Sequence, residues 1–299
     1  MGYSWEVLGE LEGKALASGG EVVDKYISSG NCTALRIGVQ VYEDGGVIPV
    51  VASVHAKMGT VNVVASPSIV GGNQVVLNAY DIPNMRAFLN PWGGGDEQHG
   101  LYGTQGDNYF IHYPYFIPLS PDPYQSKFGY RDARIKIEST ATQTLLDNVS
   151  ITVEGLIHDE DPEFYITMQN NAFTGAASDA KTDLKLPQGG MLMGAYIMGT
   201  TSLYDVTTSD NPSVHSVSIL KNNTVYKKQT NRCMIAEHPA AYYDLLGTAT
   251  VNSKDYLFYD VGWRKGMGIP VTDNNTYLEI VTAKADAIRA YPLVAMPSR

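Results

Sequence analysis

The segment Leu35-Arg-Ile-Gly-Val-Gln-Val-Tyr42 carries the clearest structural pattern in the chain. Its apolar residues fall at every second position, which places them on one face of a β-strand. The residues on that face are Leu35, Ile37, Val39 and Val41. The segment therefore predicts a strand with one buried face, in a sheet whose opposite face meets water or a partner.

Short runs of β-branched or aromatic residues recur along the whole chain, bounded by Gly, Pro, Asn or Asp. They predict further strands at residues 47–54, 60–65, 74–80, 109–116, 133–138, 149–157, 192–198, 214–220, 224–228, 248–251, 256–261, 277–282 and 288–294. Few helices are expected: one over residues 4–17 with Ser4 as its cap, and two-turn pieces at 82–89 and 239–246. This spacing predicts an all-β chain of antiparallel sandwiches or barrels.

Residues 173–190 are rich in Gly, Ala, Ser, Asp and Lys and show no strand alternation, so they predict a linker. The expected organisation is an N-terminal helical arm over residues 1–18, a first barrel over 19–172 and a second barrel over 191–299. The two halves offer similar elements in the same order, which favours a duplication. Their very low identity leaves chance similarity as the alternative.

The composition excludes several classes of protein. Apolar residues make up 44% of the 299, enough for a large core, so the chain is not disordered. The net charge of -10, without any basic block, argues against direct nucleic-acid binding. The start of the chain lacks the pattern of a signal peptide, which predicts synthesis in a cytoplasm. Cys32 and Cys233 are then expected to be free, half-buried thiols, with a disulfide between them as the alternative.

No catalytic motif is present in the sequence: there is no Gly-x-Ser-x-Gly elbow, no Walker loop and no His-Glu-x-x-His. The chain is therefore expected to be neither an enzyme nor a cofactor-binding protein. The densest carboxylate cluster, Asp159, Glu160 and Asp161, is a weak candidate for Ca²⁺. It lacks an alternating Asp-x-Asp-x-Asp-Gly loop, so a solvated acidic turn is the favoured interpretation.

Tyrosine is abundant, with 20 residues against 7 phenylalanines. Tyr suits places where one end of the ring is buried and the other meets water or a partner. A sandwich core and a subunit interface explain this abundance equally well. The interface candidates are Tyr113, Tyr115, Tyr124, Tyr130, Tyr242 and Tyr243.

From Tyr113-Pro-Tyr-Phe-Ile-Pro-Leu-Ser120 through Ala133-Arg-Ile-Lys-Ile137, the chain resembles a viral jelly-roll capsid protein. An aromatic strand ending in Ile-Pro-Leu is followed by a loop and a further strand, and Ile269-Pro-Val271 repeats this in the second half. The layout resembles the double jelly-roll major capsid proteins of icosahedral, membrane-containing viruses of bacteria and archaea. The resemblance implies two jelly-roll barrels with few short helices.

The resemblance also implies a function, a location and partners. It implies homotrimers that form pseudo-hexagonal capsomers of a virion shell and contact neighbouring capsomers, other capsid or vertex proteins and an internal membrane. The N-terminal residues Tyr3, Trp5, Leu8 and Leu11 are the expected assembly arm, and deleting residues 1–18 is expected to impair assembly more than folding. Residues 118–130 are expected to form an outer loop. The alternatives are a carbohydrate-binding or carbohydrate-active β-sandwich protein and a phage receptor-binding protein.

Overall fold

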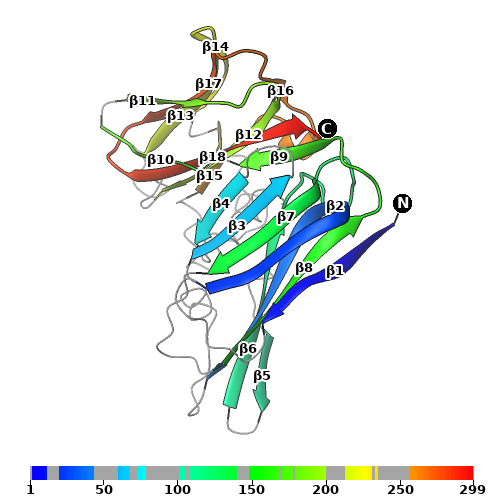
Figure 1. Cartoon of the computed structure of the whole chain (residues 1–299). Helices are drawn as coiled ribbons and strands as arrows, with labels where there is room; N and C mark the ends of the chain where they lie inside the picture. Colours follow the sequence, from blue (N-terminus) through cyan, green and yellow to red (C-terminus); the bar gives the residue numbers. More distant parts are fainter. Residues whose placement is uncertain are drawn as a thin grey trace. The chain divides into compact units, whose positions relative to one another are not determined.

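The computed structural model describes residues 2–11, 20–43, 60–67, 73–78, 101–105, 108–139, 148–168, 170–177, 179–199, 213–230, 233–234 and 256–298. Within them the chain is built of antiparallel strands and forms two compact units, Met1–Tyr165 and Ile166–Arg299 (Figure 1). The expected strands at 47–54 and 248–251, and the expected helices at 82–89 and 239–246, lie outside the described residues. No helix in the described part has the length and hydropathy needed to span a membrane.

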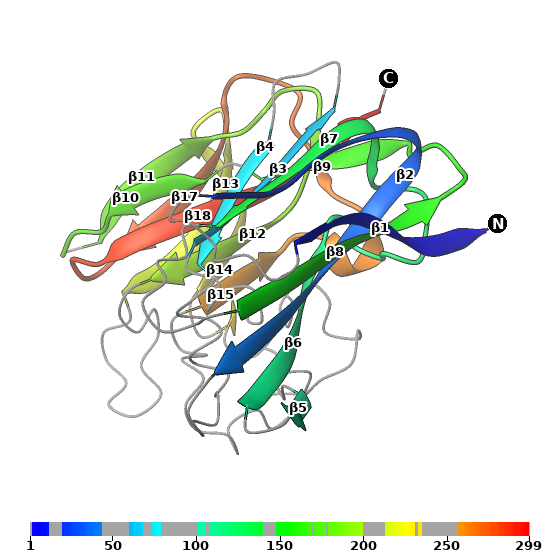
Figure 2. The same ribbon diagram turned by 60° about the horizontal axis from the view of Figure 1, so that its bottom comes forward.

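The first unit contains eight strands in the described residues. They are β1 (Tyr3–Leu11), β2 (Gly20–Glu43), β3 (Thr60–Pro67), β4 (Asn73–Asn78), β5 (Leu101–Gln105), β6 (Asn108–Pro118), β7 (Tyr130–Ser139) and β8 (Asn148–His158). These eight strands form one sheet, which has two arms joined by the long strand β2. The first half of β2 pairs with β7, which continues to β3 and β4, and its second half lies between β8 and β6. The second arm ends with β1 beside β8 and β5 beside β6 (Figure 2).

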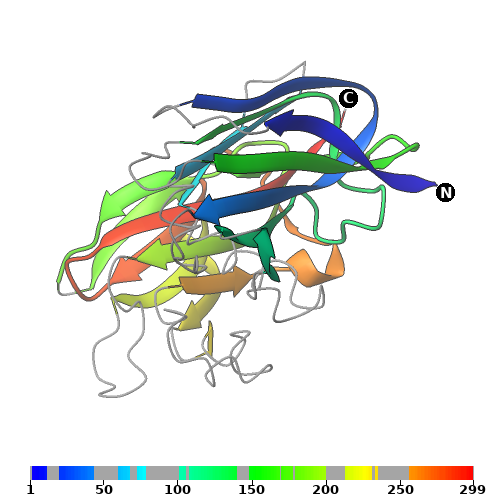
Figure 3. The same ribbon diagram turned by 90° about the horizontal axis from the view of Figure 1, so that it is seen from below.

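The two arms of the sheet meet where β2 bends, and Figure 3 shows this strand running out along one arm, turning, and returning along the other. The register of β2 against β7 shifts between Ile27 and Asn31. Gly30 lies within this shift with a φ of 83°. A left-handed φ favours glycine, which lacks the Cβ that makes this conformation strained. Gly30 therefore lets one strand contribute to both arms of the sheet.

The second half of β2 confirms the predicted alternation. Leu35, Ile37 and Val39 are fully buried, while Arg36 lies on the other face and is partly exposed. In register with Ile37 stand Val153 of β8 and Tyr115 of β6, both buried. Burial of such side chains stabilises a fold by about 1.5–3 kcal/mol each. This row of residues is part of the core of the first unit.

The second unit contains two sheets in the described residues. The first has the order β10 (Asn171–Thr174), β18 (Ala287–Pro297), β12 (Met191–Gly199), β15 (Tyr256–Asp260), with β9 (Phe164–Met168) beside β18 and β16 (Ile269–Pro270) beside β12. The second has the order β11 (Ala180–Lys185), β17 (Thr276–Thr282), β13 (Val214–Lys221), β14 (Thr224–Thr230). One 3-10 turn, η3 (Trp263–Lys265), follows β15.

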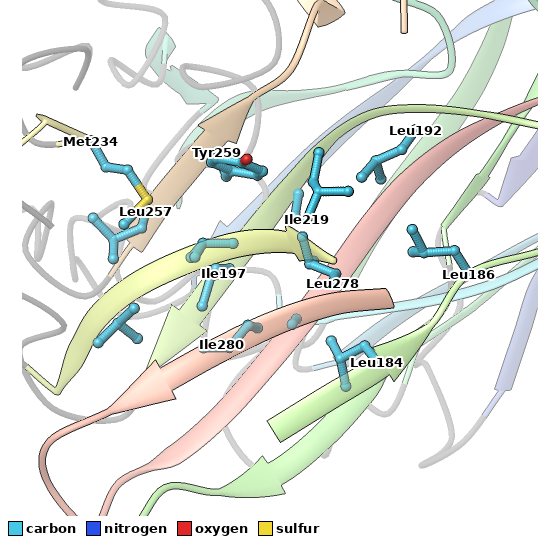
Figure 4. Close-up of a cluster of buried hydrophobic side chains, with 14 of the residues drawn as sticks. Leu184, Leu186, Leu192, Ile197, Ile219, Met234, Leu257, Tyr259, Leu278 and Ile280 are labelled. Atoms are coloured by element: carbon cyan, nitrogen blue, oxygen red, sulfur yellow. The ribbon is translucent and has the colours of Figure 1, made fainter. Parts of the chain in front are cut away.

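Side chains of both sheets meet in one apolar core in the second unit (Figure 4). Ile197 and Leu257 come from the first sheet, and Ile219, Leu278 and Ile280 come from the second. The second unit is therefore a β-sandwich, and the first unit is sandwich-like because its one sheet bends along β2. This confirms the all-β prediction of two jelly-roll units with little helix.

The N-terminal segment corrects one expectation. Residues 3–11 form the edge strand β1 instead of the predicted helical arm. The Leu and Trp spacing suits either structure, but Gly9 and Gly13 weaken a helix by about 1 kcal/mol each. Pairing with β8 satisfies the backbone of β1, with a bulge between Val7 and Gly9. Tertiary pairing therefore overrides the local helical pattern.

The predicted linker at residues 173–190 is the second correction. The unit boundary falls between Tyr165 and Ile166, and the segment contains the end of β10 and the whole of β11. Strand β11 carries Lys181, Asp183 and Lys185 on its exposed face and only Leu184 is buried. An edge strand buries few of its side chains, so it needs few apolar residues. The amino-acid composition of β11 therefore resembles that of a loop.

Candidate assembly surface

One end of the first unit displays two aromatic side chains that the sequence had singled out separately. Tyr3 of β1 is 55% exposed and Tyr124, in the loop between β6 and β7, is 54% exposed. Their ring centroids lie 5.6 Å apart, and the ring of Tyr3 also lies 5.5 Å from that of His158. Aromatic pairs at this separation attract each other. The fold thus joins two predicted residues, 121 positions apart in sequence, in one exposed pair, the Tyr3–Tyr124 pair.

Buried polar groups hold the loop that carries Tyr124, residues 119–129. The Thr33 hydroxyl donates to the Pro123 carbonyl oxygen over 2.6 Å, and His158 Nε2 lies 2.9 Å from the same oxygen. A carbonyl oxygen only accepts, so Nε2 of His158 is the donor. The side-chain amide of Asn31 donates to the Ser126 carbonyl oxygen over 2.7 Å. Asn31, Thr33 and His158, all buried, form a polar clamp on this loop.

The loop also has its own internal structure. Asp122 accepts from the backbone N–H of Tyr124 through Oδ1 (3.1 Å) and from the Gln125 side chain through Oδ2 (2.7 Å). Such an Asp caps a tight turn by replacing a backbone acceptor. Asp122 within the loop and the polar clamp beneath it therefore fix the position of Tyr124. β6 ends at Pro118 and β7 begins at Tyr130, so residues 119–129 form a loop as expected, and its position on the outside of a shell stays a prediction.

A second feature lies on the outer face of the sheet that contains β1. The guanidinium of Arg36 lies 4.5 Å from the ring centroid of Trp5, and its Nε lies 2.6 Å from Oε2 of Glu154. The Trp5 ring meets Phe116 edge to face at 6.2 Å. These four half-exposed residues, the Trp5 cluster, come from β1, β2, β6 and β8. Cation–π and ion-pair contacts at exposed sites contribute about 0.5–1 kcal/mol each.

The acidic turn after β8 makes contacts within the protein. Glu160 accepts from the Ser126 hydroxyl over 2.5 Å, and Asp161 pairs with Arg131. The backbone N–H of Asp159 donates to the carbonyl oxygen of Gly2. Among the described residues, no three His, Cys, Asp or Glu side chains form a group that could hold a metal ion. The turn thus joins the Tyr124 loop and β1 to the end of β8.

The remaining predicted site residues divide into two groups. Tyr115 and Tyr130 are 1% and 2% exposed and belong to the core, so the interface interpretation is wrong for them. Leu8 is buried as well, and packs inward from β1. The side chains of Leu11 and Tyr113, and all of Tyr242 and Tyr243, lie outside what the structure describes.

The clamp residues Asn31, Thr33 and His158 were not predicted. Asn31 and Thr33 are close to the bend of β2, and His158 ends β8. Their only sequence signal is a polar residue beside a strongly apolar strand, which is too common to be specific. Their role depends on the register that pairs Asn31 with His158.

Both cysteines are free, which confirms one expectation, but neither is half-buried. Cys32 is fully buried, and desolvation raises the pKa of its thiol from 9.0 to about 12. Cys233 is exposed. Cys32 thus behaves as a small core residue, while Cys233 is the accessible thiol.

No protein-family model and no curated protein matches this chain. Its fold, in contrast, matches that of viral capsid proteins over nearly its whole length. The crystal structure of the major capsid protein of Sulfolobus Turreted Icosahedral Virus (STIV) aligns with a TM-score of 0.64 and 11% identity, over 99% of this chain and 97% of that one.

Two further capsid structures align with similar coverage. Major capsid protein P2 of bacteriophage PM2 gives a TM-score of 0.54 at 10% identity, over 99% of this chain and 98% of that one. The PBCV-1 protein VP54 gives 0.53 at 8% identity, over 98% and 94%. The chain therefore has the double jelly-roll fold of these proteins.

Proposed function

We propose that this protein is the structural major capsid subunit of an icosahedral virus, and that it works through contacts between copies. The observation that carries the proposal is the full-length match of both units to major capsid proteins at nearly equal chain length. A match of one sandwich alone would carry little, because many unrelated proteins use a β-sandwich. A match of two consecutive sandwiches in one chain is far more restrictive.

The proposed unit of assembly is a homotrimer. Three copies of a chain with two similar sandwiches present six similar bodies around one axis, which gives a pseudo-hexagonal outline able to tile a shell. The low share of charged residues, 17% against about 25% in typical soluble proteins, supports extensive burial between subunits. The exposed Tyr3–Tyr124 pair supplies an aromatic surface suited to such contacts.

The proposal extends to location and partners. The protein is placed in the virion capsid after synthesis in the host cytoplasm, with neighbouring capsomers, other capsid or vertex proteins and an internal membrane as its neighbours. A structural, non-enzymatic role follows from the capsid assignment. Direct binding of nucleic acid is not part of the proposal, because the chain is acidic.

The test is the state of association of the purified full-length protein. Sedimentation velocity and native mass spectrometry are expected to give a trimer or a larger species, and electron microscopy is expected to show hexagonal particles or arrays. A strictly monomeric protein at all concentrations would overturn the proposal. If that monomer also bound oligosaccharides on a glycan array, the carbohydrate-binding alternative would replace it.

A further inference from the structure

Six large apolar side chains are exposed in the described part of the chain, and four of them form two pairs: Tyr3 with Tyr124 in the first unit, and the neighbours Val225 and Tyr226 in the second. The other two are Val7 on β1 and Met267 after η3. Tyr226 is 61% exposed and its neighbour Val225 is 54% exposed, both on β14. Exposed apolar groups that gather on a surface mark interaction sites more often than those scattered singly.

The charges around these two places are opposite in sign. Exposed carboxylates outnumber cations near the Tyr3–Tyr124 pair: Asp122 precedes Tyr124 in the loop, Asp159 and Glu160 follow β8, and Lys127 is the exposed cation of the loop. Together these residues form the acidic aromatic end. The hairpin of β13 and β14, residues 221–230, carries Lys221, Lys227 and Lys228 and contains no Asp or Glu. We call residues 221–230 the basic hairpin.

The basic hairpin is well defined. Asn222 and Asn223 form its turn with φ values of 51° and 61°, the left-handed pair that a tight two-residue hairpin requires. Lys221 Nζ lies 4.9 Å from the ring centroid of Tyr226. Lys227 turns inward and donates to the Asp260 carbonyl oxygen over 3.2 Å. Lys221 and Lys228 are therefore the cations available to a partner.

We infer that the acidic aromatic end of one copy receives the basic hairpin of a second copy. Each chain carries both surfaces, so the contact joins two different surfaces and is heterologous. Repeated from copy to copy, such a contact forms the closed ring of the proposed trimer. Opposite charge fixes the register and disfavours contact between like surfaces, while the tyrosines provide the buried apolar area. β14 carries lysines and a bulge, both of which oppose direct strand pairing. The contact is therefore made by side chains.

This inference rests on the proposed function, and a charge exchange tests it. The variant Lys221→Glu/Lys228→Glu and the variant Asp159→Lys/Glu160→Lys are each expected to weaken self-association by at least about tenfold, because each places like charges together. The variant with all four substitutions is expected to recover it. The control Lys185→Glu/Lys284→Glu changes the same charge elsewhere in the second unit and is expected to associate like the wild type.

A second measurement does not depend on charge. In a Cys233→Ser background, chains with Tyr124→Cys are mixed with chains carrying Tyr226→Cys, then oxidised mildly. Disulfide-linked dimers are expected from the mixture and not from either variant alone. If the wild type assembles but both charge-reversed variants associate normally, this contact is overturned and the capsid proposal stands. The same holds if the wild type assembles but the mixed cysteine variants give no cross-linked dimers. A monomeric wild type overturns both.

Discussion

His158 Nε2 lies 2.9 Å from the carbonyl oxygen of Pro123, and this contact ties the end of β8 to the loop that presents Tyr124. The Thr33 hydroxyl donates to the same oxygen over 2.6 Å. Two donors on one buried acceptor make the loop's position tolerant of losing either donor, but not of losing both.

The clamp predicts a non-additive pair of mutations. His158→Phe and Thr33→Val are each expected to lower the free energy of unfolding by about 1 kcal/mol, because the remaining donor still satisfies the Pro123 oxygen. The double variant is expected to cost more than the sum, since it leaves a buried carbonyl without a partner. Urea unfolding of all four proteins gives the coupling energy. Additivity within about 0.5 kcal/mol would contradict the shared acceptor.

The bend of β2 predicts an unusually costly glycine. In Gly30→Ala the new Cβ would lie 2.6 Å from Ile157 Cγ2 and 2.9 Å from the His158 carbonyl oxygen, at a φ of 83°. We expect a loss of more than about 2 kcal/mol, from backbone strain and overlap together.

Gly189→Ala is the matched control for this substitution. Gly189 has a φ of 80° but no atom within 4 Å of the new Cβ. Backbone strain alone predicts a cost of about 1–2 kcal/mol. Hydrogen exchange of the strands beside each glycine measures both effects. Equal losses at the two glycines would show that crowding at the bend contributes nothing.

The inward side of β1 predicts that the N-terminal strand matters for folding as well as for assembly. Leu8 is buried, and its Cδ1 lies 3.1 Å from a Cβ built on Gly155. Leu8→Ala is expected to destabilise the first unit by about 2–3 kcal/mol. Val7→Ala, at a 48% exposed neighbour, is expected to change stability by less than about 0.5 kcal/mol. Thermal unfolding compares the two variants. Similar melting temperatures for Leu8→Ala and Val7→Ala would mean that β1 packs only loosely on the first unit.

The two cysteines predict different reactivity. In the native protein near neutral pH, a thiol reagent is expected to modify Cys233 rapidly and Cys32 only after denaturation, because Cys32 is fully buried and protonated. Mass spectrometry of peptides after timed labelling identifies the modified thiol. Rapid native labelling of Cys32 would show that the bend of β2 opens readily.

The raised pKa of Cys32 also predicts how stability depends on pH. Above pH 9.0 the unfolded chain loses the thiol proton while the folded protein keeps it until about pH 12, so stability falls as pH rises through this window. Burial raises the pKa of Tyr259 as well, which adds to the fall. In the Cys32→Ala variant, the urea midpoint is expected to fall less steeply with rising pH than in the wild type. It still falls, because Tyr259 remains. An unchanged slope would show that Cys32 does not titrate in this range.

Much of the fold could be predicted from local patterns. The alternation in residues 35–42 predicted the buried face of β2, and the short β-branched runs predicted most of the strands that the structure describes. The prediction was wrong for β1 and β11, and it missed β5, β9, β10 and β16. β1 and β11 are edge strands, and an edge strand is specified by the neighbour that offers it hydrogen bonds. The candidate site was predicted in parts: Tyr3 and Tyr124 were named, but not as a pair, and the polar clamp was missed.

The sequence alone determined the fold class, because apolar residues alternating with period two leave a chain with so little helical pattern no other way to bury its core. It also determined the net charge of -10 and the absence of a recognisable catalytic motif. Only the tertiary structure decided which polar residues hold the 119–129 loop, which tyrosines are exposed, and which belong to the core. Those outcomes depend on the register between strands far apart in sequence, and a shift of one residue would turn each of these side chains to the opposite face.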